Sequence, residues 1–167
     1  MLRGKSVFLR LIDKNDTVLI FSWENDEEIK KVTRIESSLS IQMIDALIEE
    51  QMNVWDSGQI RFIICKADTG APLGTVDLYE VNFNLFTAVI GILIARESDR
   101  NKGYGREAIQ LIHEYANNTL GIKQISAKIQ KENARSIAFF NSTGYVEKTD
   151  IDMYKELRLF NWKAGNA

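Results

Sequence analysis

The sequence predicts an α+β domain built on a mixed, mostly antiparallel central sheet with helices on both faces. Strand-like runs alternate with helix-like segments, and three strands follow one another in the middle of the chain. One of these runs, residues 88–95, is apolar on both faces, which is typical of a strand in the middle of a covered sheet. With 167 residues, 45% of them hydrophobic, the chain is long enough to bury one core, so we expect a single domain over residues 1–167.

Each predicted element rests on periodicity and on the residues that bound it. β-branched and aromatic residues mark the strands, and apolar residues at steps of three or four mark the helices. Asp, Ser or Asn before a helix can cap it, and glycine after a helix stops it. In order, we predict a strand over 5–12, a helix after Asp13–Asp16, a helix from Ser40 to near Ser57, an antiparallel hairpin of strands over 60–66 and 73–81, a strand over 88–95, a helix over 103–120, a strand over 122–130, a helix over 133–141, and two strands over 145–162 around Thr149–Asp150.

Charge and composition narrow the expected partners. The 21 basic and 23 acidic residues give a net charge of -2, so we expect no nucleic-acid partner. No stretch has the length and apolarity of a membrane span or a signal peptide, so we expect no membrane association and a cytoplasmic location. The single cysteine, Cys65, is expected to be a buried, inert thiol, and the single histidine, His113, to lie on a helix surface. No metal site is therefore predicted.

The strongest functional signal is Arg100-x-x-Gly103-x-Gly105, which follows the buried strand and opens the long helix. The first N–H groups of a helix have no intrahelical partner and the helix dipole is positive there, so a phosphate can collect several hydrogen bonds. Glycines at 103 and 105 let the backbone approach the phosphate, and Arg100, Lys102 and Arg106 add positive charge. We therefore expect an anion at this helix start.

The same residues have two interpretations other than an anion site. The first is an ordinary glycine-containing loop with a helix cap. The second is a dinucleotide-binding loop, but that fingerprint needs three spaced glycines within a parallel βαβ unit. Ala108 and Ile109 stand where the third glycine would be expected, which argues against a dinucleotide.

The loop and a second segment resemble the GNAT acetyltransferases, whose pyrophosphate loop reads Gln/Arg-x-x-Gly-x-Gly/Ala. The segment Asn133-Ala134-Arg135-Ser136, followed by Gly144-Tyr145, is similar to the family's Asn-x-x-Ser/Ala and Gly-Phe segment. The resemblance implies the GNAT fold, splayed at the fourth strand, and acetyl-CoA as the acetyl donor without a metal. The residues that it assigns to the donor are Ile92, Leu93, Ile94, Arg100, Asn101, Lys102, Gly103, Tyr104, Gly105, Arg106, Asn133 and Ser136.

Within this family the chain looks most like the branch of spermidine acetyltransferases and acetylases of ribosomal-protein N-termini. Val7-Phe8-Leu9-Arg10, Trp23-Glu24-Asn25-Asp26 and the acidic run 74–82 carry that likeness. It implies transfer of acetyl to a primary amine on a small cationic molecule such as a polyamine. Acetylation of a peptide N-terminus and a non-catalytic acetyl-CoA-binding module are the alternatives, and a homodimer is left open.

The resemblance implies direct attack of the amine on the acetyl thioester, with a backbone N–H of the splayed strand stabilising the oxyanion. An alkylammonium has a pKa of about 10.4, so a group must remove its proton. Asp77 and Glu80 are the candidate catalytic acids, and Glu36, Asp77 and Glu80 are the candidate substrate residues. Asp77 and Glu80 should point to opposite faces of a regular strand unless a bulge intervenes.

Two departures from the family pattern affect the proton steps. Phe140 stands where many relatives have a tyrosine that protonates the thiolate, and Val89 or Ile90 stands where many have a glutamate. We therefore expect proton transfer through water and another residue, such as Tyr104 or Tyr145, or catalysis chiefly by positioning.

Overall fold

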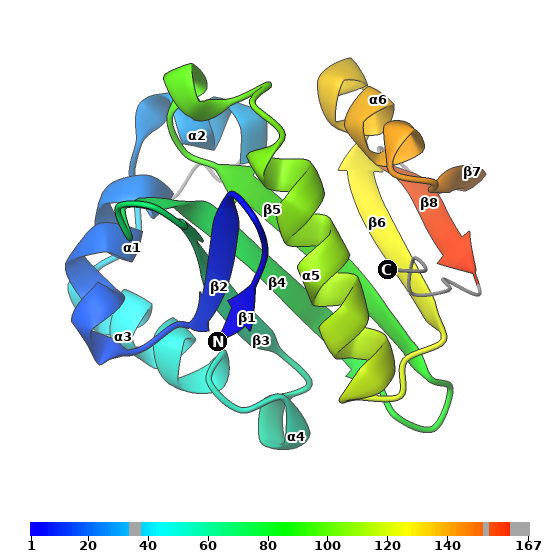
Figure 1. Ribbon diagram of the computed structural model, residues 1–167, viewed down its shortest axis with the longest axis horizontal. Coiled ribbons are helices and arrows are strands. Elements are labelled where there is room, and N and C mark those ends of the chain that lie inside the picture. The colour runs from blue at the N-terminus through cyan, green and yellow to red at the C-terminus, as the bar shows by residue number, and fades with distance from the viewer. Residues whose placement is uncertain (34–37, 152–153, 161–167) are drawn as a thin grey trace.

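One mixed sheet runs through the described chain (Figure 1), which in this computed structural model comprises residues 1–33, 38–151 and 154–160. Across these residues eight strands pair in the order β1-β2-β3-β4-β5-β6-β8-β7. Every neighbouring pair is antiparallel except β5 and β6, which are parallel. The predicted fold class is confirmed. The strands are β1 (Leu2–Arg3), β2 (Val7–Leu11), β3 (Ile60–Lys66), β4 (Pro72–Asn82), β5 (Thr87–Ile94), β6 (Gln124–Gln130), β7 (Val146–Ile151) and β8 (Tyr154–Phe160).

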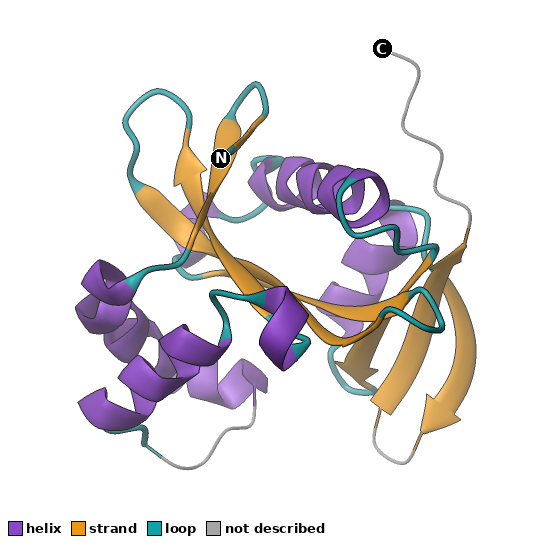
Figure 2. Cartoon of the chain, turned by 90° about the horizontal axis from the view of Figure 1, so that it is seen from below, coloured by secondary structure: helices purple, strands orange, loops and turns teal. Residues whose placement is uncertain are grey.

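Helices cover both faces of the sheet (Figure 2). The long helix α5 crosses one face, and α6 lies over the C-terminal strands on the same side (Figure 1), whereas α1, α2 and α3 lie on the opposite side. None of the helices in the described residues is long and apolar enough to cross a membrane. The α-helices are α1 (Thr17–Glu24), α2 (Glu27–Thr33), α3 (Ile41–Glu50), α4 (Val54–Ser57), α5 (Tyr104–Asn118) and α6 (Ala134–Ser142).

Side chains alternate across the sheet and so form a separate core on each face. On the α5 face, Val76, Leu78 and Ile90 pack beneath the apolar side of α5. On the opposite face, Ile63 and Cys65 of β3 pack against α1 and α3. Cys65 is a buried free thiol, as predicted, and its burial raises its pKa.

The single helix predicted from Ser40 to near Ser57 is two helices. The carbonyl of Gln51 accepts a hydrogen bond of 3.0 Å from the amide of Arg61 in β3, so it is not used to continue α3. The Asn53 side chain then accepts the amide of Trp55 and starts α4. The apolar period continues across this break, and for that reason periodicity alone could not reveal it.

The reversal predicted around Thr149–Asp150 is wrong. Both residues lie inside β7, where they pair with Glu156 and Lys155 of β8, so the strand continues through them to Ile151. β7 is an edge strand, and edge strands tolerate polar residues that resemble a turn in the sequence. The short elements β1 and α2 were also absent from the prediction.

His113 does not lie on the helix surface, contrary to prediction. Its side chain is buried at 2% exposure, and Nε2 lies 2.7 Å from the hydroxyl oxygen of Tyr145. Burial lowers the pKa of His113 to about 4 and raises that of Tyr145. This contact connects α5 with the segment that leads into β7.

Candidate active site

The parallel strands β5 and β6 separate after a short stretch of pairing. Only Thr87, Ala88 and Val89 of β5 have partners in β6 among the described residues. The amide of Ala95 donates to Leu73 of β4 at 2.9 Å, so by alternation the amides of Ile92 and Ile94 point away from β4 and toward the opening. The expected splay at the fourth strand of the prediction, β5, is confirmed, and it leaves backbone donors without a strand partner.

A cavity of about 660 Å³ lies at this opening, between β5, the start of α5 and the start of α6. Every residue assigned to the donor from the sequence lines it, except Lys102. The lining residues are Ile29, Ile92, Leu93, Ile94, Asp99, Arg100, Asn101, Gly103, Tyr104, Gly105, Arg106, Asn133, Arg135, Ser136, Ala138, Phe139 and Ser142.

Gly103 is the N-cap of α5 and has a left-handed backbone, with φ at +86°. A side chain there would be strained, although nothing lies within 4 Å of an added Cβ. No side chain caps this helix start, and the first intrahelical bond runs from the amide of Glu107 to the carbonyl of Gly103. The preceding amides are therefore available to an anion in the cavity.

Gly105 also lines the cavity, and its surroundings differ from those of Gly103. An added Cβ would lie 3.4 Å from the ring of Phe139 and 3.6 Å from Cδ1 of Ile92. These are ordinary van der Waals distances, so a Cβ at 105 would fit against α6 and β5, whereas Gly103 supplies the backbone turn and the open space.

The basic residues around the cavity differ in how they are held. Arg100 donates from Nε to the carbonyl of Ile94 at 3.0 Å and from Nη2 to that of Ala95 at 3.2 Å, so it closes the end of the opening. Arg106 donates to the carbonyl and hydroxyl of Ser142 at 2.9 and 3.0 Å, which ties α5 to α6. Arg135 is exposed and lines the cavity.

Arg135 was not predicted as a site residue, although the sequence held a signal for it. It lies two residues after Asn133, within the first turn of the helix that faces the cavity. Asn133 itself caps α6 by accepting the amide of Ser136 at 3.0 Å. Its side-chain NH₂ group can still donate to a bound molecule.

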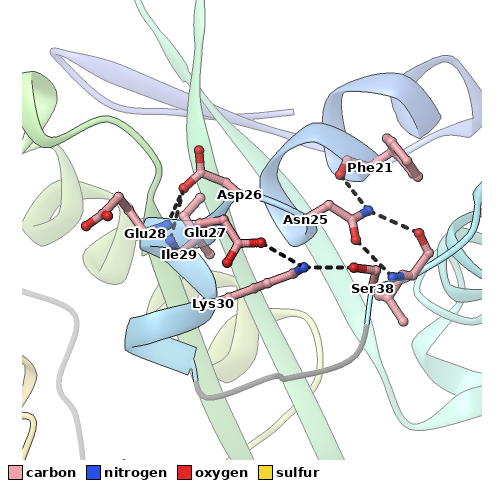
Figure 3. A network of polar contacts seen from close by, with 9 residues as sticks. Phe21, Asn25, Asp26, Glu27, Glu28, Ile29, Lys30 and Ser38 are labelled. Carbon is pink, nitrogen blue, oxygen red and sulfur yellow. Dashed lines mark hydrogen bonds and ion pairs between the residues drawn. The ribbon is translucent and has the colours of Figure 1, made fainter.

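Helix α2 reaches the cavity from the opposite side of the sheet through Ile29, which is 4% exposed. A polar network holds this helix (Figure 3). Asp26 accepts the amides of Glu28 and Ile29, and Lys30 bridges Glu27 and Ser38. Because α2 was not predicted, no signal in the sequence pointed to Ile29.

Asp77 and Glu80 lie outside the cavity lining, and each has a basic neighbour. Asp77 Oδ1 lies 3.6 Å from Nε of Arg61, and Glu80 accepts from Nζ of Lys128 in β6 at 2.7 Å. A bulge between Tyr79 and Asn82, with φ of +49° at Glu80, breaks the regular alternation on which their opposite facing was predicted. Glu36, the third acid of the prediction, lies outside the described residues.

Of the two tyrosines considered for proton transfer, only Tyr104 lines the cavity. Tyr145 is 2% exposed and is held by His113, so it is not available to a bound thiolate. Phe140 is 3% exposed and packs edge-on against Tyr145 at 5.0 Å between ring centroids. Among the described residues, no group of three or more potential ligands is placed to hold a metal ion.

A helix start with free amides beside a splayed parallel strand pair suits the binding of a phosphate-bearing molecule. The chain belongs to the GNAT acetyltransferase family: the model described as "Acetyltransferase (GNAT) domain" matches residues 6–146. It is therefore an enzyme of the N-acetyltransferase class.

The chain is also similar to named proteins and to solved structures. The chain is 28% identical over 155 residues to alpha/beta-tubulin-N-acetyltransferase 9 of Drosophila melanogaster, covering 82% of this chain and 74% of that protein. The spermidine N-acetyltransferase of Vibrio cholerae, solved with CoA and spermine, superposes with a TM-score of 0.84 at 21% identity, covering 98% of this chain and 100% of that one. A candidate ribosomal-protein-serine acetyltransferase of Vibrio cholerae has a TM-score of 0.74 at 17% identity, covering 95% and 96%.

Proposed function

We propose that this enzyme transfers the acetyl group of acetyl-CoA to a primary amine by direct attack within a ternary complex. One observation carries the proposal: a single cavity is lined by the start of α5 and by α6 on one face of the sheet, and by Ile29 of α2 on the other. Donor and acceptor can therefore approach the opening between β5 and β6 from opposite sides.

The donor side has groups suited to each part of acetyl-CoA. The free amides after Gly103 and the positive charge of Arg135 suit the phosphates, and the NH₂ group of Asn133 suits an amide of the pantetheine arm. Acetyl-CoA supplies an activated thioester: the neutral amine nitrogen bonds to the carbonyl carbon, the carbon–sulfur bond breaks, CoA leaves as a thiolate, and the proton that the nitrogen loses ends on that thiolate. The amides of Ile92 and Ile94 are placed to stabilise negative charge on the carbonyl oxygen.

Proton transfer in this proposal relies on few protein groups. Tyr104 is the one predicted hydroxyl that lines the cavity, and Asp77 lies beside the opening on the acceptor side. A thiolate is a fair leaving group, so positioning of the two reactants accounts for most of the expected rate enhancement.

Two acceptor classes follow from the family. The sequence favoured a small polycation such as a polyamine, which the name of one structural relative supports. The name of the Drosophila relative supports a protein amine instead. The pairing of Asp77 with Arg61 and of Glu80 with Lys128 leaves less uncompensated negative charge for a polycation than the sequence suggested, and this favours the second class.

Thiol release from acetyl-CoA in the presence of an amine panel tests the proposed function. We expect release with at least one primary amine, and none with its N-acetylated form. Binding of acetyl-CoA by calorimetry without thiol release on any amine would instead identify a non-catalytic binding module, the role that Phe140 leaves open.

A further inference from the structure

We propose that Glu24, Arg61 and Asp77 form the site that receives the ammonium group of the acceptor, and that this acceptor carries a single ammonium group. The inference rests on the proposed function and adds to it the acceptor's charge class and docking site. Arg61 of β3 lies between the other two residues: Nη1 is 3.0 Å from Glu24 Oε1, and Nε is 3.6 Å from Asp77 Oδ1.

The three side chains are largely removed from water, with exposed fractions of 14% for Arg61, 19% for Glu24 and 16% for Asp77. Two carboxylates and one guanidinium leave one uncompensated negative charge. Glu24 is also the last residue of α1, where the helix dipole disfavours a negative charge. One more cation would balance the cluster in a partly desolvated setting, where charge pairs are stronger than at a surface.

Asp77 is placed beside the opening by a glycine. Gly91 of β5 lies opposite Asp77 in register, and a Cβ added to Gly91 would lie 2.9 Å from Oδ2 of Asp77. The carboxylate therefore rests against the backbone of β5. Gly91 comes two residues after Val89, the last residue of β5 that pairs with β6, so this carboxylate lies where the opening begins.

The cluster is incompletely hydrogen-bonded. Arg61 Nε and Gln51 Oε1 are the two buried side-chain atoms without a hydrogen-bond partner in the part of the chain that the structure describes. The two residues are adjacent, because the amide of Arg61 donates to the carbonyl of Gln51 at 3.0 Å. Buried polar atoms are normally satisfied. An ammonium group could donate to an oxygen such as Gln51 Oε1, whereas Arg61 Nε is itself a donor and needs an acceptor, such as the Asp77 carboxylate 3.6 Å away.

The neighbouring charges indicate a single ammonium group. Beyond the cluster, Glu80 is paired with Lys128, and Glu156 is paired with Arg158 at 2.9 Å. Each of these two pairs is balanced, so the described acids Glu80 and Glu156 leave no net negative charge for a second ammonium group. An acceptor with one ammonium head and an uncharged tail, such as a peptide N-terminus, fits this surface better than a polyamine does.

The test uses the full-length enzyme and two probes, a neutral tetrapeptide with a free N-terminus and spermidine. Glu24→Gln should raise the peptide's KM at least about tenfold with kcat changed far less, and Asp77→Asn should raise that KM by a similar factor, because each removes the uncompensated charge. Gly91→Ala should act in the same direction, because it displaces the Asp77 carboxylate without changing any charge. Glu49→Gln is the matched control. It neutralises an exposed acid of α3 that is paired with Lys14.

Affinity for acetyl-CoA, measured by calorimetry, should be unchanged in all four variants, and calorimetry of the peptide with CoA present tests docking without turnover. Unchanged peptide affinity in both Asp77→Asn and Gly91→Ala would overturn the docking site. A higher kcat/KM for spermidine than for the peptide would overturn the single-ammonium acceptor. Failure of the wild type to bind acetyl-CoA would overturn the proposed function instead, while peptide binding would still report on the cluster.

Discussion

At the scale of single residues, the two glycines that flank α5 share a left-handed backbone conformation, but only one of them lines the cavity. Gly103 precedes the helix with φ of +86°, and Gly121 follows it with φ of +71°, and nothing lies within 4 Å of an added Cβ at either. An alanine at either position costs about 1–2 kcal/mol of backbone strain. Only the alanine at 103 would project into the space where the donor's phosphates are expected.

We therefore expect Gly103→Ala to weaken CoA binding by an order of magnitude or more, and Gly121→Ala to leave it unchanged. Both variants should lose similar stability, measured by urea unfolding, while calorimetry reports CoA affinity. Equal CoA affinity in the two variants would contradict an anion site at the start of α5.

Asn133 permits a similar comparison between two caps. Its side chain accepts the amide of Ser136, and that of Asn53 accepts the amide of Trp55. Loss of such a cap costs about 1 kcal/mol of stability. Asn133→Ala should in addition weaken CoA binding several-fold, because one further hydrogen bond is worth about 0.5–1.5 kcal/mol. Asn53→Ala should not change CoA affinity, and if both variants bind CoA as the wild type does, Asn133 is only a cap.

At the scale of elements, the buried contact between His113 of α5 and Tyr145, just before β7, makes the free energy of unfolding depend on pH. The folded pKa of His113, lowered by burial to about 4, lies below its ordinary value of 6.5. The folded state therefore favours the neutral imidazole. The contribution of this group to the free energy of unfolding is complete above pH 6.5 and is lost as the pH falls toward 4. At pH 5 the loss is about 2 kcal/mol.

Urea unfolding at pH 7.5 and pH 5 measures this effect, with His113→Gln as the reference. The wild type should lose about 2 kcal/mol more than the variant between these two values. Parallel losses in the two proteins would mean that His113 does not carry the dependence.

The elements also show which features the sequence could reveal. Strands β3, β4 and β5 and helix α5 were predicted because their periodicity and their caps agree. The break between α3 and α4 was missed because a long-range bond from Arg61 to Gln51 causes it, and the burial of His113 was missed because its partner is Tyr145, far along the chain. Most residues that line the cavity could be predicted because a local loop and one helix start carry them, whereas the contact of Arg61 with Glu24 needs the folded sheet.

At the scale of the whole molecule, the proposed donor site joins distant parts of the chain, so ligand binding should stabilise all of them. Acetyl-CoA at one hundred times its dissociation constant should add about 2.7 kcal/mol to the free energy of unfolding. Thermal unfolding should show a clear rise in Tm with acetyl-CoA or CoA and much smaller shifts with NAD or ATP. An equal shift with NAD would indicate a dinucleotide site.

The short pairing of β5 with β6 has a dynamic consequence. Three residue pairs connect the part of the sheet that contains β1 to β5 with the part that contains β6, β8 and β7. Segments joined by so few backbone bonds can open as separate cooperative units, well below the free energy of global unfolding. Amide hydrogens of β6 and β8 should then exchange with solvent faster than those of β3 and β4. A molecule held by α5 and α6 together would merge the two units and slow that exchange.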